Sequence, residues 1–148
     1  MTKLLLSVHV LAAILVVGPI TVAASLFPRY ARQASPVAAL LHRICRGYAV
    51  AGVAVPVFGL ATALQLGVLT DAWLLTSLAL TAIAAAVLAL AILPGQRLLL
   101  TGGEGDGDTT GASRATASRL AMLTGVFNIL WAVVVVLMIV RPGSTTGA

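Results

Sequence analysis

The chain has 148 residues, of which 60% are hydrophobic and 9% are charged, and its mean hydropathy is +1.10. Soluble domains carry about 25% charged residues, so this composition excludes an ordinary soluble domain and predicts an integral membrane protein. The formal net charge is +5, but its arginines are scattered and lack the interleaved aromatic residues of a nucleic-acid surface. We therefore expect the lipid bilayer as a partner and no nucleic acid.

Four apolar runs are each long enough to cross a bilayer, since about 20 helical residues span roughly 30 Å of hydrocarbon. They predict one all-α domain over residues 1–148, a polytopic membrane protein with four transmembrane helices in an antiparallel up-down bundle. The predicted helices cover residues 3–27, 36–70 with its membrane part at 47–70, 72–93 and 119–140, and a flexible Gly/Asp-rich loop covers 101–113.

Prolines define the expected ends and bends of these helices. Pro28 and Pro94 are expected to end the first and third helices, because proline lacks the N–H that continues a helix. Pro19 and Pro56 lie inside apolar runs and predict kinks, which membrane helices tolerate. Only Asp71 separates the second and third helices, so these two are expected to form a tight hairpin.

Small residues mark the expected packing faces. Gly59, Ala63 and Gly67 are spaced four apart and predict a face for close helix packing. The basic residues predict the orientation: Arg29, Arg32, Arg43, Arg46, Arg97, Arg114 and Arg119 lie in the first and third connections, against Lys3 and Arg141 on the other side. The positive-inside rule then places both termini outside and both arginine-bearing connections in the cytoplasm.

The four carboxylates of the chain all fall outside the predicted spans; they are Asp71, Glu104, Asp106 and Asp108. Carboxylate proton relays and acid/base pairs within the bilayer are therefore disfavoured. We assign no catalytic residue and no metal site, and an enzyme is the less favoured interpretation. The polar side chains left inside the spans include His9, Gln65 and Asn128.

His9 is the main candidate, because ionisable groups inside a span are rare and face a partner. By helical rise it lies roughly 8 Å below the outer surface, with Gln65 at a similar depth. One hypothesis makes His9 an axial ligand of a b-type haem, with Lys3 or Arg141 near the propionates. The other makes it a buried neutral histidine, hydrogen-bonded to Gln65 or to a neighbouring carbonyl.

The other polar residues have structural interpretations. Asn128 is expected to join two helices by a hydrogen bond. His42 lies more than about 20 Å from His9 along the membrane normal, so one haem does not bridge them. We expect His42 beside anionic lipid headgroups, and Cys45 near the interface as a small apolar side chain.

The stretch Lys3-Leu-Leu-Leu-Ser-Val-His9-Val-Leu-Ala-Ala-Ile-Leu-Val-Val-Gly18, with Leu-Phe-Pro28-Arg-Tyr30 after it, resembles the first helix of a group of small bacterial integral membrane proteins. The group includes an uncharacterised four-helix family, the copper-resistance-D-type proteins and the haem-binding type of protoporphyrinogen oxidase. The resemblance implies a location in the bacterial inner membrane, a haem-ligand role for His9 and a packing position at Gly18. The oxidase type also carries a tryptophan near that glycine, a further histidine after the first helix and a membrane-embedded lysine, whereas this sequence has valines near Gly18, no histidine between His9 and His42, and no lysine inside an apolar run.

Three functions remain open from the sequence. In the first, the chain is a small membrane protein of the uncharacterised family that holds a haem through His9. In the second, it is a non-catalytic accessory subunit that stabilises a larger membrane complex. The third and least favoured is a transporter or channel component, which would need a homo-oligomer because no charged residue lines a path through the membrane.

Overall fold

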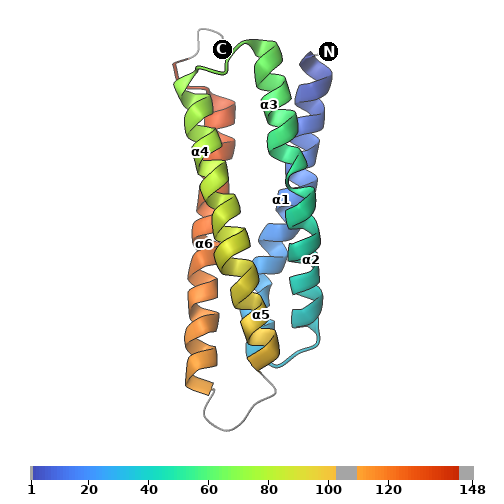
Figure 1. The fold of residues 1–148 in the computed structure, drawn as a ribbon, viewed down its shortest axis with the longest axis vertical. Helices are drawn as coiled ribbons and strands as arrows, with labels where there is room; N and C mark the ends of the chain where they lie inside the picture. Colours follow the sequence, from blue (N-terminus) through green and yellow to red (C-terminus); the bar gives the residue numbers. More distant parts are fainter. Residues whose placement is uncertain (1, 103–109, 144–148) are drawn as a thin grey trace.

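The computed structural model of the protein describes residues 2–102 and 110–143. Every regular element in these residues is helical: α1 (Thr2–Arg32), α2 (Val37–Ala51), α3 (Ala54–Leu66), α4 (Ala72–Ala86), the π-helical segment η1 (Val87–Ile92), α5 (Leu93–Thr101) and α6 (Thr110–Val140). These elements make four long helical rods. The rods lie side by side, and α1 begins at the same end of the molecule at which α6 ends (Figure 1). The expected all-helical fold class is confirmed.

Four helical stretches are long and apolar enough to cross a membrane: Lys3–Arg32, Val37–Leu66, Ala72–Thr101 and Gly111–Val140. Most side chains in these stretches are not buried inside the protein, and many large aliphatic ones are exposed, such as Leu90 at 78% and Ile139 at 75%. Such a surface suits a hydrocarbon environment rather than water.

The first helix is longer than the sequence predicted. We expected an end at residue 27, but α1 runs through both Pro19 and Pro28 to Arg32. The side chain of Phe27 is completely buried, and it belongs to the packed cluster that joins α1 to the other helices. Tertiary packing of this turn therefore outweighs the hydrogen bond that Pro28 removes.

The second rod consists of two helices, with its break close to the kink that Pro56 predicted. α2 ends at Ala51 and α3 begins at Ala54. Because Pro56 has no N–H to give to the carbonyl of Gly52, that carbonyl accepts the N–H of Val55 at 3.1 Å instead. The helix expected over 36–70 is thus divided into α2 and α3 close to its predicted kink, and it ends at Leu66 and not at residue 70.

The third rod also continues past its expected end at residue 93. α4 is followed by the wider π-helical turns of η1, and Pro94 stands in the first turn of α5, which ends at Thr101. The π-helical turns accommodate this proline: Leu93 donates its N–H to the carbonyl of Leu88, five residues back, and the wider turn leaves room for a residue that has no N–H. Gly95 lies against α6, where a Cβ atom would approach Cδ2 of Leu120 to 2.9 Å.

The fourth helix begins at Thr110 rather than at residue 119, because a polar stretch joins the apolar run in a single helix. Part of the expected loop at 101–113 is thus helical. Residues 103–109, which include Glu104, Asp106 and Asp108, lie outside the described residues.

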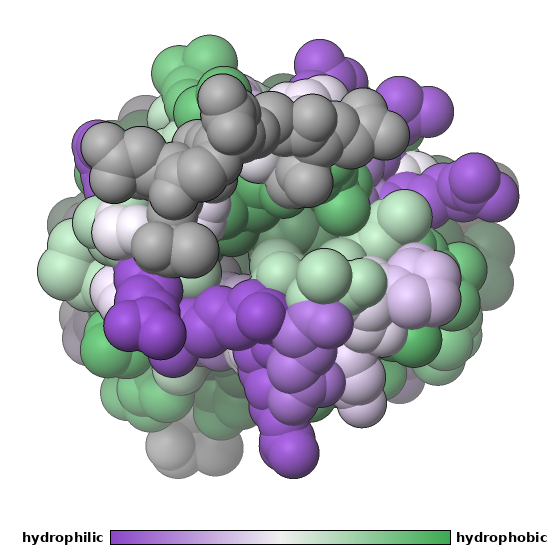
Figure 2. All heavy atoms as spheres, turned by 90° about the horizontal axis from the view of Figure 1, so that it is seen from below, coloured by the Kyte–Doolittle hydropathy of each residue, from purple (hydrophilic) through white to green (hydrophobic). Residues whose placement is uncertain are grey.

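The packed core occupies the half of the molecule that is remote from the start of α1. Its fully buried members include Phe27, Cys45, Ala84 and Ile92, from α1, α2, α4 and η1, with Phe127 from α6. The end of this half carries the seven arginines of the first and third connections, all exposed. Hydrophilic side chains lie around the rim of this end, seen from below in Figure 2.

Candidate ligand cavity at His9

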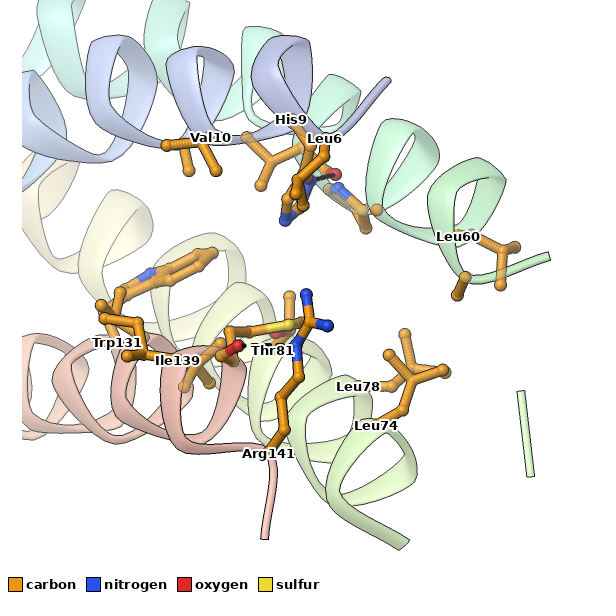
Figure 3. A pocket seen from close by; sticks show the side chains of 18 of the residues that line it. Leu6, His9, Val10, Leu60, Leu74, Leu78, Thr81, Trp131, Ile139 and Arg141 are labelled. Carbon is orange, nitrogen blue, oxygen red and sulfur yellow. Dashed lines mark hydrogen bonds between the residues drawn. The ribbon is translucent and has the colours of Figure 1, made fainter. Parts of the chain in front are cut away.

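A cavity of about 950 Å³ occupies the other half of the molecule. Its walls come from α1, α3, α4 and α6, and Figure 3 shows side chains from these helices facing one another across it. The lining is mainly aliphatic, with Leu6, Val10, Leu60, Leu74, Leu78 and Ile139 among its members. The volume lies at the upper end of the about 300–1,000 Å³ typical of small-molecule and cofactor sites.

His9 is the imidazole in this wall, and its orientation is fixed by one hydrogen bond. Its Nδ1 lies 2.9 Å from the carbonyl oxygen of Val55 on α3. A carbonyl can only accept, so Nδ1 carries the hydrogen and donates it. In the neutral imidazole, Nε2 then keeps its lone pair and can bind a metal ion or accept a hydrogen bond. Of the two partners expected for His9, the structure shows a backbone carbonyl and not Gln65.

Gly59 makes room for this imidazole. A Cβ atom built on Gly59 would lie 2.8 Å from Cε1 and 3.1 Å from Nδ1 of His9. Gly59 stands one helical turn after Val55, on the same face of α3, so the ring rests on the glycine while it reaches the carbonyl. The sequence predicted Gly59 as part of a face for helix packing. In the structure it also leaves space for the ring of His9.

Arg141 supplies a cationic group at the cavity. It ends α6 with a left-handed backbone (φ 45°), and its Nε donates to the carbonyl oxygen of Met138 at 3.3 Å. Its guanidinium lies 5.6 Å from the ring centre of Trp73, whose Nε1 donates to Asp71 at 3.0 Å. Figure 3 shows Arg141 and His9 projecting from opposite walls. Lys3, the other candidate cation, is exposed and does not line the cavity.

Trp131 lines the same cavity from α6. Its ring packs edge-on against Phe127, with centroids 6.3 Å apart, and its Nε1 is buried without a hydrogen-bond partner in the described structure. One turn earlier, Nδ2 of Asn128 donates to Oγ of Ser25 at 3.3 Å, which joins α6 to α1. Oδ1 of Asn128 is likewise buried and unpaired. Asn128 thus occupies an interhelical position outside the cavity lining.

Several residues singled out in the sequence lie apart from the cavity. Gln65 is exposed near the end of α3. Gly67 follows α3 with a φ of 68°, so it ends the helix instead of extending the packing face, whereas Ala63 is buried and lines the cavity. Gly18 is exposed, and a Cβ atom there would meet nothing within 4 Å, so it is not a packing position.

A buried polar group at the opposite end escaped the sequence analysis. Gln96, which is 1% exposed, accepts a hydrogen bond from Nδ1 of His42 at 2.8 Å and directs its Nε2 to Sγ of Cys45 at 3.7 Å. His42 is thus turned toward α5, and Cys45 is fully buried instead of facing the interface. The expected helix end at Pro94 had placed Gln96 outside the bundle, so no signal pointed to this contact.

The titratable residues show no cluster typical of a metal centre: within the described ranges, no group of three His, Cys, Asp or Glu side chains could hold a metal ion. Comparisons with protein-family models, with curated proteins and with solved structures find no match for this chain.

Proposed function

We propose that this chain is a four-span protein of the bacterial plasma membrane that binds one b-type haem, with Nε2 of His9 as an axial ligand. The spans would run antiparallel, with both ends of the chain outside the cell. The membrane part of the proposal is supported by the four long apolar helices and by the seven arginines at one end, which the positive-inside rule assigns to the cytoplasm.

The observation that carries the haem proposal is the hydrogen bond from Nδ1 of His9 to the carbonyl oxygen of Val55. Histidines that bind metals commonly donate their other N–H to a carbonyl or a carboxylate, which fixes the tautomer and the ring orientation. His9 has this arrangement, and its ring belongs to the lining of the cavity.

The cavity fits a macrocycle in its size and its chemistry. It has a volume of about 950 Å³ and an aliphatic lining, which suits a large apolar ring. A haem also carries two propionates, and the guanidinium of Arg141 is the cation at this cavity that could neutralise one of them. A bound haem would supply one-electron chemistry. The chain itself would hold the iron through His9 and surround the ring with the aliphatic lining of the cavity.

Titration of the detergent-purified protein with haemin tests the proposal. We expect a shifted Soret band that saturates at one haem per chain, and we expect its loss in His9→Leu. The control variant is His42→Leu, which removes the other histidine at the far end of the bundle and should leave the band unchanged. A band of equal size in His9→Leu would show that haemin binds elsewhere or without specificity, and would overturn the proposal.

A further inference from the structure

The four helices around the cavity form a ring that is closed on three sides. α3 packs against α1, α1 packs against α6, and α6 packs against α4. The fourth side lies between α3 and α4, and these two helices make few contacts although only the turn at residues 67–71 joins them. Figure 1 shows them apart at this end. The expected tight hairpin is therefore wrong, and the cavity opens sideways between α3 and α4.

The rims of this opening are apolar. Leu60 of α3 and Leu78 of α4 both line the cavity, and each is 47% exposed. Figure 3 shows Leu60 on one side of the gap and Leu74 and Leu78 on the other. If the helices span a membrane, an opening with such rims at mid-helix faces hydrocarbon and not water. Acyl chains are what a bilayer presents at that depth.

A charge on the far wall points to the kind of lipid. Arg141 uses Nε in a hydrogen bond to its own helix, and among the described residues its Nη atoms have no hydrogen bond or ion pair. Its position directly after α6 places the guanidinium near the level of the lipid headgroups, where it can bind a phosphate through two N–H groups. A zwitterionic headgroup would offset that attraction with its own cation.

We infer that the cavity is a lateral binding site for an anionic phospholipid, with one acyl chain inserted between α3 and α4 and the phosphate at Arg141. The inference rests on membrane insertion, which belongs to the proposed function, but it does not require haem. It uses the opening between α3 and α4, whereas the haem proposal uses His9; both proposals use Arg141 as the cation at the cavity. Bound haem and the inserted acyl chain would occupy the same space, so they would compete.

The two tryptophans of the chain, Trp73 and Trp131, allow a direct test. In Trp73→Phe, the remaining fluorophore is Trp131 in the cavity wall. We would reconstitute this variant, without haem, in bilayers that contain a small fraction of phospholipid brominated along its acyl chains. Brominated phosphatidylglycerol should at least halve the emission of Trp131, and the same fraction of brominated phosphatidylcholine should quench it much less. The phenylalanine at position 73 keeps an aromatic ring under Arg141.

Substitutions then locate the site. Adding Arg141→Gln should remove the difference between the two lipids, and the matched control Lys3→Gln, an exposed cation outside the cavity lining, should preserve it. Adding Leu60→Phe with Leu78→Phe should narrow the opening and reduce quenching by both lipids.

Equal quenching by both lipids, unchanged in Arg141→Gln, would show contact with bulk lipid only and overturn the inference. Quenching by a brominated fatty acid but not by brominated phosphatidylglycerol would identify a free fatty acid as the occupant and also overturn it. The lipid comparison needs no substitution in the cavity wall, so it does not depend on the folding of those variants. A protein that binds haemin but shows no lipid preference would retain the proposed function and lose this site. A protein that prefers brominated phosphatidylglycerol but does not bind haemin would retain this lipid site and lose the proposed haem function.

Discussion

The imidazole of His9 rests on Gly59, where a Cβ atom would come within 2.8 Å of Cε1. The contact brings Nδ1 within 2.9 Å of the carbonyl oxygen of Val55. It therefore fixes both the position of the ring and the nitrogen that carries the hydrogen. Gly59 on α3 thus allows the ring position and the Nδ1 hydrogen bond of His9, the one histidine that lines the cavity in the described structure.

Gly59→Ala should displace this ring. Overpacking of a tight contact costs about 1–3 kcal/mol, and the displaced imidazole would lose its hydrogen bond to Val55. We expect a lower melting temperature in detergent and weaker haemin binding. The matched control is Gly18→Ala, at an exposed position where a Cβ atom meets nothing within 4 Å. Equal melting temperatures for the two variants would show that Gly59 does not support His9.

His9→Leu should still fold as a helical protein, because a leucine suits an apolar cavity wall. The lost hydrogen bond is worth only about 0.5–1.5 kcal/mol, and the larger buried apolar area offsets part of that loss. Circular dichroism and membrane yield would measure the effect. If this variant failed to accumulate in the membrane, His9 would be a structural residue, and the haem proposal would lose its basis.

Gln96→Leu should destabilise the opposite end of the bundle. It leaves Nδ1 of His42 without its acceptor, and a buried polar group without a partner costs about 1–3 kcal/mol. The measurement is a double-mutant cycle with His42→Leu, using the free energies of unfolding of the two single variants and the double variant. We expect the double variant to be more stable than the sum of the two losses indicates. Strict additivity would show that the 2.8 Å hydrogen bond does not contribute to stability.

Membrane orientation can be measured with single cysteines in a Cys45→Ala background. Thr70→Cys lies in the turn between α3 and α4, and Ala112→Cys lies near the start of α6; both positions are exposed. The positive-inside rule predicts that a membrane-impermeant thiol reagent added to intact cells labels position 70 and not position 112. The reverse pattern would invert the proposed orientation, including the placement of the cavity in the outer half of the membrane.

Hydropathy was sufficient to predict four membrane-length helices, because an apolar run of this length has few alternatives. The ends of the helices were predicted less well. Pro28 and Pro94 were predicted to end their helices. The helix continues past Pro28, where Phe27 is buried by packing, and past Pro94, which follows the π-helical turns of η1. The packing of Phe27 depends on neighbouring helices, which local sequence signals do not contain, and no local signal indicated the π-helical turns before Pro94.

The candidate site was predicted in part, since His9 stood out as an ionisable residue in an apolar run. Its partner could not be derived, because any backbone carbonyl on a facing helix is a possible acceptor. The imidazole reaches the carbonyl of Val55 because Gly59, one turn later on α3, leaves space for the ring. The roles of Trp131 and of the opening between α3 and α4 likewise depend on how the helices are arranged.

Absorbance spectra of the protein as isolated test the central proposal most directly. The protein would be purified in detergent from cells with ample haem supply, and the spectra recorded oxidised and after reduction with dithionite. The account predicts a Soret band and reduced b-type bands in the unsubstituted protein and in His42→Leu, and no such bands in His9→Leu. A colourless protein that also fails to bind added haemin, or bands that persist in His9→Leu, would contradict the assignment of His9 as a haem ligand.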